Sequence, residues 1–215
     1  MNNPMMKLVI EDNFFDNPDY LREIALSLDD EWRMNETVDC RTGWKGRRTD
    51  PFRIIEDHHD ILNKYSKQVF DYVYDALNLS EYTYPNSEGF NGYADGAEIS
   101  GLKPERLTIT SYFHITTEST KNGFSDFWTD RFHKDYLPCA GVVYLNPDAP
   151  LNAGTSILDG PKNQFVNIEN KYNRLVAYDG YYIHGLSNVF GDSKETGRLT
   201  FTFFIHEEKY TGLFS

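Results

Sequence analysis

Residues 106–115 read RLTITSYFHI, and this stretch decides the fold class of the chain. β-branched and aromatic residues dominate it, and Gly, Asn, Asp and Pro turns separate it from later stretches of the same texture. Those stretches are AGVVYL (140–145), QFVNI (164–168), NRLVAY (173–178) and RLTFTFFI (198–205). The pattern predicts a run of short antiparallel strands, which is typical of a sandwich or a jelly roll.

The first half of the chain shows helical periodicity instead. Asn17 followed by Pro18 is a typical helix start, and apolar residues follow it at near-helical spacing. Between Ile54 and Leu79, apolar residues recur every three or four positions, which predicts the buried face of a longer helix. Helices that precede a run of strands indicate an α+β class, with the helices packed on a sheet. Residues 81–103 and 116–132 fit neither period and are predicted loops.

Composition limits the function classes. The chain has 215 residues and a formal net charge of -12, which repels nucleic-acid backbones and argues against a nucleic-acid partner. Hydrophobic residues make up 40% of it, so it is expected to fold. We expect a single domain over 1–215, with a helical part and a loop in 1–100 and a strand core in 101–210.

The sequence predicts a cytoplasmic protein without a membrane segment. No apolar run approaches the roughly 18 residues that a membrane span needs. The start, MNNPMMKLVIEDNFF, lacks the features of a secretory signal. Cys40 and Cys139 lie far apart, so they form neither a disulfide framework nor a CxxC metal motif.

Two His-x-Asp tripeptides are candidate metal ligands. His58 and Asp60 fall in a helical pattern, where residues two apart point about 200° away from each other, so we interpret them as helix surface. His133 and Asp135 precede the predicted strand at 140–145 in an extended segment. Residues two apart in such a segment project to the same face, so this pair can converge on an ion.

His184 is the candidate third ligand, after a short turn that follows the strand at 173–178. Two histidines and one carboxylate form the facial triad of non-haem Fe(II) oxygenases, which leaves coordination positions open for cosubstrate and oxygen. Arg198 opens an aromatic strand 14 residues later. Burying its guanidinium is costly unless an anion meets it, which points to an acidic ligand in the same cavity.

Taken in order, these segments resemble the Fe(II)/2-oxoglutarate-dependent dioxygenases, particularly the prolyl-4-hydroxylase-like branch. The resemblance covers about residues 106–206 and rests on the His-x-Asp pair at 133–135, AGVVYLN, GPKNQFVNIENKYNRLVAY, His184 and Arg198. It implies a double-stranded β-helix, that is, a cupin-like jelly roll with N-terminal helices packed on the major sheet.

The resemblance also implies roles for individual residues. His133, Asp135 and His184 would hold Fe(II), and Arg198 would pair with the distal carboxylate of 2-oxoglutarate. Further cosubstrate contacts would come from Tyr112, Tyr144 and Thr200. The implied reaction uses O2, converts 2-oxoglutarate to succinate and CO2, and hydroxylates a C–H bond of a small molecule or peptide. The substrate of this branch is a prolyl residue. The implied reductant is ascorbate.

Phe127, Trp128 and Arg131 lie just upstream of the first ligand pair and are the substrate-side candidates. A basic cluster around Trp44 is interpreted as a solvated loop, with contact to an acidic partner as the alternative; its members are Arg41, Lys45, Arg47 and Arg48. Two other functions remain as alternatives. One is a non-catalytic jelly roll that binds a ligand or partner, and the other is a zinc hydrolase, which would have no use for a buried arginine.

Overall fold

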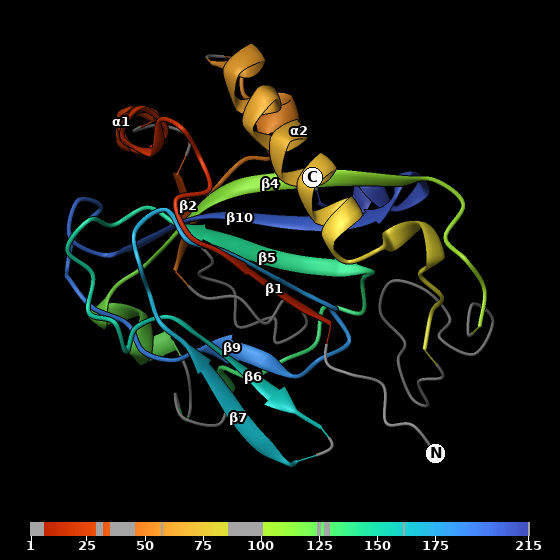
Figure 1. The fold of residues 1–215 in the computed structure, drawn as a ribbon. Coiled ribbons are helices and arrows are strands. Elements are labelled where there is room, and N and C mark those ends of the chain that lie inside the picture. Colours follow the sequence, from red (N-terminus) through yellow and green to blue (C-terminus); the bar gives the residue numbers. More distant parts are fainter. Residues whose placement is uncertain are drawn as a thin grey trace.

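Two antiparallel sheets face each other in the computed structural model (Figure 1). The structure describes residues 7–28, 32–34, 46–56, 58–85, 101–123, 126, 130–160 and 162–214. The larger sheet has the order β1 (Leu8–Glu11), β8 (Leu175–Tyr178), β5 (Cys139–Tyr144), β10 (Arg198–Glu207), β4 (Leu107–Thr116), β3 (Arg47–Thr49) and β2 (Trp32–Met34). The smaller sheet has the order β7 (Gln164–Ile168), β6 (Thr155–Asp159) and β9 (His184–Leu186).

Strand β10 lies at the centre of the larger sheet and separates two cores. It pairs with β4 along its whole length, from Arg198 opposite Thr116 to Glu207 opposite Leu107. Because side chains alternate across a strand, Phe201 and Phe203 join the core on the helix side, while Phe204 packs against the core between the two sheets. One strand therefore serves both an outer apolar core and the interior of a jelly-roll-like sandwich.

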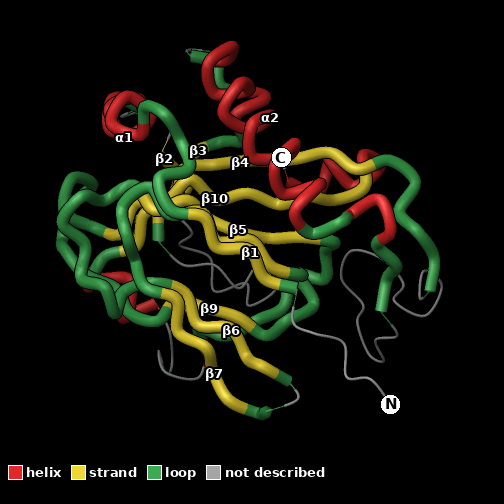
Figure 2. Tube along the Cα trace, viewed as in Figure 1, coloured by secondary structure: helices red, strands yellow, loops and turns green. Residues whose placement is uncertain are grey.

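Helices α1 (Pro18–Ser27) and α2 (His59–Ala76) cover the outer face of the larger sheet (Figure 2). Asn17 caps α1 by accepting a hydrogen bond from the Tyr20 amide at 3.2 Å. Helix α2 buries Leu62 and other apolar residues against the sheet. The described residues also form four short 3₁₀ helices: η1 (Phe52–Ile54), η2 (Leu79–Glu81), η3 (Glu118–Gly123) and η4 (Glu208–Phe214).

An aromatic cluster joins the helical layer to the sheet. The Phe52 ring lies 4.6 Å from that of Phe113 on β4 and 5.3 Å from that of Phe201 on β10, between centroids. The Phe15 ring contacts Phe201 at 5.7 Å. Ring pairs of this kind, tilted or edge-to-face, add to the free energy gained from burial, so they stabilise the packing of the helical layer on the sheet.

The strands and helices expected from sequence are present, but the structure adds strands that were not expected. β1 and β3 come from the part expected to be helical and loop, and β6 and β9 complete the smaller sheet. These strands have three to five residues, too few for an alternating pattern to stand out. Of the predicted loops at 81–103 and 116–132, residues 86–100, 124–125 and 127–129 lie outside the described residues.

Two further expectations concern cysteines and membranes. Cys139 is buried and free, and Cys40 lies outside the described residues. Within the ranges that the structure describes, no helix combines the length and apolar character needed to cross a membrane.

We predict that Leu62→Ala lowers the free energy of unfolding by about 2–5 kcal/mol, because it removes a fully buried side chain between α2 and the sheet. Leu151→Ala is the matched control, since Leu151 is 54% exposed and its loss is expected to change stability by at most about 0.5 kcal/mol. Urea denaturation measures both. Equal effects of the two variants would contradict the packing of α2 on the sheet.

Candidate metal centre

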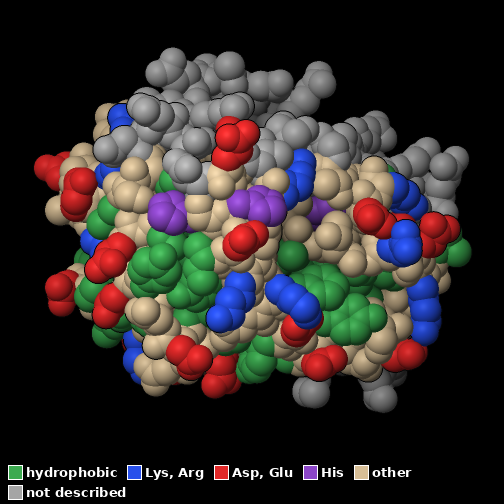
Figure 3. Space-filling view, turned by 90° about the horizontal axis from the view of Figure 1, so that it is seen from above, with side chains coloured by type: hydrophobic (Ala, Val, Ile, Leu, Met, Phe, Trp, Pro, Cys, Tyr) green, Lys and Arg blue, Asp and Glu red, His purple; other side chains and the backbone are tan. Residues whose placement is uncertain are grey.

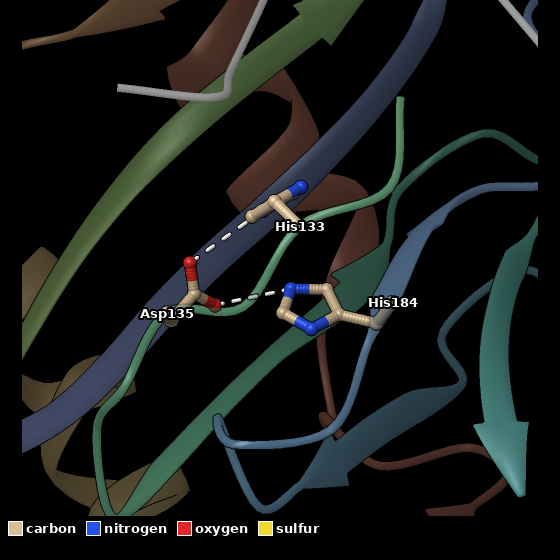
Figure 4. A group of neighbouring side chains, drawn as sticks. All are labelled: His133, Asp135 and His184. Carbon is tan, nitrogen blue, oxygen red and sulfur yellow. Dashed lines mark ion pairs between the residues drawn. The ribbon is translucent and has the colours of Figure 1, made fainter. Parts of the chain in front are cut away.

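Three potential metal ligands meet between the two sheets (Figure 4). His133 and Asp135 precede β5, and His184 is the first residue of β9. One ligand atom from each residue lies within 4.8 Å of the others. The exposed fractions of the three side chains are 32% for His133, 14% for Asp135 and 5% for His184, so the cluster opens toward solvent on the His133 side.

Backbone hydrogen bonds place these side chains before any ion binds. His133 and His184 form an isolated antiparallel bridge, in which each amide donates to the other's carbonyl at 2.9 Å. The Asp135 amide donates to the Gly180 carbonyl, also at 2.9 Å. Both ligand segments are therefore tied to the chain that leads from β8 into β9.

Two glycines allow this close approach. A Cβ atom at Gly185 would lie 2.4 Å from the Arg131 carbonyl oxygen, and one at Gly180 would lie 2.7 Å from that of Leu137. Because real Cβ atoms do not approach backbone that closely, any side chain at either position would push the two ligand segments apart. The turn before His184 thus depends on glycine for packing.

Carbonyl groups orient both imidazoles. Nδ1 of His184 lies 2.9 Å from the Tyr182 carbonyl oxygen, and Nδ1 of His133 lies 3.3 Å from that of Arg131. A carbonyl only accepts, so each Nδ1 carries the proton, and in a neutral ring the Nε2 lone pair is free. Nε2 of His133 and of His184 lie 3.5 and 3.1 Å from the two oxygens of Asp135.

This arrangement fits a cation. Two imidazole lone pairs and a carboxylate repel one another unless a positive charge lies among them, and Oδ2 of Asp135 is buried without a hydrogen-bond donor. Burial would raise the pKa of Asp135, but without a metal ion the charge of His184 and hydrogen bonds from both histidines hold it well below its usual range. Burial likewise opposes protonation of His133, but the Asp135 carboxylate raises its pKa above the ordinary value. The site therefore keeps its carboxylate ionised.

Two nitrogen ligands and one oxygen ligand suit several divalent ions. The set matches the facial arrangement of non-haem iron and also resembles the donors of catalytic zinc sites. The three ligands by themselves do not distinguish oxygen chemistry from hydrolysis. The distinction must come from the other side chains of the interior.

Arg198 is that further feature. It is 2% exposed, and its hydrogen bonds reach only neutral acceptors: the carbonyl oxygens of Ala153 at 3.0 Å and Gly154 at 3.4 Å, and Oγ1 of Thr155 at 3.5 Å. No carboxylate among the described residues pairs with it. Burial lowers the pKa of Arg198, and the neighbouring Tyr144 opposes that shift. A buried guanidinium without an acidic partner favours an anionic ligand.

Strand β6 connects Arg198 to the metal ligands. Thr155, which contacts Arg198, pairs with Leu186, and Ile157 two residues later pairs with His184. The Tyr178 ring also lies 4.5 Å from that of His184. Arg198 and the metal ligand His184 therefore lie along the same pair of strands, β6 and β9.

The other predicted cosubstrate residues lie on the same interior face, with different contacts. Tyr144 is fully buried, its hydroxyl lies 2.7 Å from that of Thr155, and Cζ of Arg198 lies 5.3 Å from its ring. Thr200 bonds instead to the His114 carbonyl at 3.3 Å. Tyr112 is fully buried on β4 and packs beside Phe204 at 6.1 Å.

The substrate-side candidates are only partly described. Arg131 holds His133 through its carbonyl, and its guanidinium stacks on Phe132 at 4.5 Å. Phe127 and Trp128 lie outside the described residues. Of the basic cluster, Arg47 is exposed and Arg48 lies over the Tyr112 ring at 4.3 Å, whereas Arg41 and Lys45 are also outside the described residues.

The second His-x-Asp tripeptide forms no metal cluster with other described residues. His58 caps the start of α2 in a left-handed conformation, and His59 forms an ion pair with Asp60 at 3.6 Å on the exposed helix surface. Sequence reasoning missed Tyr178, Thr155 and the two glycines at 180 and 185. Only the glycine in the short turn before His184 offered a sequence signal for them.

Comparisons with known proteins support the fold. No protein-family model matches the chain, and no curated protein matches it in sequence. A solved structure of a Pseudomonas putida prolyl-4-hydroxylase is similar, with a TM-score of 0.59 and 14% identity over 95% of this chain and 94% of that one. A Trichoplax adhaerens prolyl hydroxylase, solved with a hypoxia-inducible-factor oxygen degradation domain peptide fragment, has a TM-score of 0.56 and 12% identity, covering 98% and 88%. The chain thus shares the fold of these enzymes.

We predict that Fe(II), or Co(II) as an air-stable substitute, binds one-to-one and stabilises the protein, by about 2.7 kcal/mol at a concentration 100 times Kd. Asp135→Ala and His184→Ala should abolish this stabilisation, because each removes a ligand. His59→Ala is the control, since it removes an exposed histidine that also pairs with an aspartate. Thermal unfolding with and without metal measures the effect, and unchanged binding by Asp135→Ala would refute the ligand assignment.

A second prediction concerns Asp179, which supports the turn before His184 by accepting a hydrogen bond from the Tyr181 amide at 2.9 Å. Burial raises the pKa of its carboxyl from 3.8 to about 6. The folded state therefore holds this proton more tightly than the unfolded state, and the stability of the protein relative to Asp179→Asn should fall as pH rises through that interval. Urea denaturation across the interval, with a ¹³C NMR titration of the carboxyl, checks it. A pH-independent difference would contradict the shift.

Proposed function

We propose that this protein is an Fe(II)- and 2-oxoglutarate-dependent dioxygenase that hydroxylates a C–H bond. The observation that carries the proposal is the pairing, on one interior wall, of a two-histidine, one-carboxylate cluster with a buried arginine that has no acidic partner among the described residues. A zinc hydrolase needs no such arginine. A keto-acid cosubstrate with a distal carboxylate uses both features.

The proposed architecture is one oxygenase domain over 1–215, with a double-stranded β-helix core in 101–210. The two facing antiparallel sheets and the likeness to two prolyl hydroxylase structures support it. The helices on the outer face hold the larger sheet in place and contribute none of the proposed ligands.

In this proposal, His133 and His184 hold iron through Nε2 and Asp135 holds it through a carboxylate oxygen. Bound iron, with 2-oxoglutarate and O2, supplies the oxidising power for C–H hydroxylation. Arg198 pairs with the distal carboxylate of 2-oxoglutarate and orients it along β6. The loaded site is then electrically neutral, which favours its assembly in a cavity of low dielectric.

The protein's own groups contribute positioning and water exclusion. Before metal binds, the two histidines already keep Asp135 ionised by lowering the pKa of its carboxyl. Burial raises the pKa of Tyr144 and of Tyr178, so both remain neutral hydrogen-bonding groups beside the cosubstrate. Tyr112 and Thr200 are proposed as further cosubstrate contacts from the same interior face. No separate general base is required by this assignment.

The proposed substrate is a small molecule or a peptide, with a prolyl residue as the first choice. The Trichoplax enzyme was solved with a peptide fragment, which supports testing peptides. Arg131, with Phe127 and Trp128, is proposed to border the substrate side because this segment leads directly into His133. Ascorbate as reductant and a reducing, cytoplasmic setting belong to the same proposal.

We predict that the wild-type protein with Fe(II), ascorbate and 2-oxoglutarate releases succinate even without substrate, and that anaerobic loading gives a visible charge-transfer band. Arg198→Gln should raise the KM for 2-oxoglutarate about ten- to a hundredfold, because a hydrogen bond to a charged group contributes about 1.5–3 kcal/mol. Metal binding should persist. Arg106→Gln is the control, since Arg106 is exposed and pairs with Glu208 at 3.2 Å.

The outcomes separate the competing functions. Metal binding without succinate release or a charge-transfer band would favour a non-catalytic jelly-roll binding module. Unchanged KM in Arg198→Gln, with succinate still released, would show that another group holds the cosubstrate. Hydrolysis of an ester by the zinc-loaded protein, at a rate that Arg198→Gln does not change, would favour the hydrolase.

A further inference from the structure

A cavity lies on the opposite side of the larger sheet from the metal centre. Its volume is about 440 Å³, within the range of about 300–1,000 Å³ typical of small-molecule sites. Residues from η1, α2, β4 and η4 line it, and all of them are described by the structure. None of the three candidate metal ligands, nor Arg198, contributes to it.

Most polar side chains around this cavity are already bonded to their neighbours. Lys67 pairs with Asp71 at 2.5 Å, Asn63 bonds to His59 at 2.8 Å, and the Ser66 hydroxyl donates to the Leu62 carbonyl at 3.0 Å. These groups compensate one another in charge and in hydrogen bonding. They therefore leave no unpaired charge or hydrogen-bonding group that would favour a ligand.

Two residues in the cavity wall each have one buried polar atom without a hydrogen bond. Ser111, on β4, is 3% exposed, and its Oγ is buried with no hydrogen bond. Arg53, in the middle of η1, donates from Nη2 to the Thr211 carbonyl at 3.1 Å, and its Nη1 is buried and unbonded. No ion pair joins Arg53 to a carboxylate of the described chain. Leaving buried donors unsatisfied costs about 1–3 kcal/mol each, and more for a charged group.

The two groups have complementary chemistry for one kind of ligand. A guanidinium N–H and a hydroxyl can both donate to an oxyanion, and a charge-assisted pair of this kind is among the stronger hydrogen bonds in proteins. The bond to Thr211 restrains one nitrogen of the Arg53 guanidinium and leaves Nη1 as the unbonded donor. The cavity wall also includes Phe52, Phe70 and Leu107, which suit an apolar body attached to the anion.

The wider surface does not explain anion binding here. The chain carries a net charge of -12, and the helical face seen from above shows acidic and basic side chains side by side (Figure 3). A diffuse positive patch is therefore not the source of attraction. Any anion affinity must come from the local donors.

We propose that this cavity is a binding site for a small organic anion, whose carboxylate or phosphate group accepts hydrogen bonds from Arg53 and Ser111. The site is separate from the metal centre, and the proposal does not depend on the oxygenase assignment. Both anion classes share the required chemistry, so the experiment includes one probe of each.

The test is an NMR titration of the ¹⁵N-labelled full chain with inorganic phosphate or with benzoate, at constant ionic strength set by chloride. Site-resolved amide shifts distinguish this cavity from Arg198, which could also attract anions. We expect saturable shifts at the amides of residues 53 and 111 with at least one probe. Preference for phosphate or for benzoate identifies the anion class.

Two pairs of variants decide the assignment. Arg53→Gln should weaken binding at least tenfold, the change that about 1.4 kcal/mol produces. Arg22→Gln should leave it unchanged, because Arg22 also has a buried, unbonded Nη1 and one carbonyl partner, Glu195, but does not line the cavity. Ser111→Ala should weaken binding, whereas Ser66→Ala, which removes a hydroxyl already bonded to Leu62, should not.

Several results would overturn the proposal. These are the absence of saturable shifts at residues 53 and 111 with either probe, equal weakening by Arg22→Gln and Arg53→Gln, or equal weakening by the two serine variants. If Arg53→Gln fails to fold, as its amide spectrum would show, the serine pair gives the decision.

Discussion

The candidate metal centre depends on one backbone interaction, the two-bond bridge between His133 and His184. It joins the segment that leads into β5 of the larger sheet to β9 of the smaller sheet. Without it, no direct backbone contact would fix the relative positions of these two imidazoles, which are 51 positions apart in the chain. Because the bridge forms from main-chain groups, it positions the ligands independently of the metal, and it lowers the conformational entropy that metal binding would otherwise have to remove.

The side chains near this bridge include charged groups, so the interior between the sheets must accommodate buried charge. From Leu199 to Ile205, the β10 side chains that face the helices are apolar, while Arg198 and the two following threonines face the smaller sheet. The helical layer therefore supplies hydrophobic stabilisation that the polar interior does not provide. This division explains how one strand can hold a buried guanidinium at its start and still anchor an aromatic core along its length.

How much could be predicted from sequence depended on the length of each pattern. The ten-residue strands β4 and β10 and the eighteen-residue helix α2 repeat their period often enough to be recognised. β1, β3 and β9 do not, because three or four residues cannot establish an alternation, and their pairing is decided by tertiary contacts. The ligand pair at 133–135 could be inferred because residues two apart share a face, whereas Thr155 and Tyr178 enter the site through sheet register, which a single sequence does not encode locally.

The same alternation separates the outer cavity from the interior that holds the metal centre. Ser111 and Tyr112 are neighbours on β4, but Ser111 lines the cavity beneath α2, while Tyr112 packs with Phe204 in the interior. A ligand in the outer cavity would therefore touch the strand that forms part of the inner wall. Proximity of this kind does not produce allostery, because coupling requires an element with two alternative arrangements that both ligands influence. β4 is hydrogen-bonded to β10 over all ten residues, so it is a rigid partition, and the two sites should bind their ligands independently.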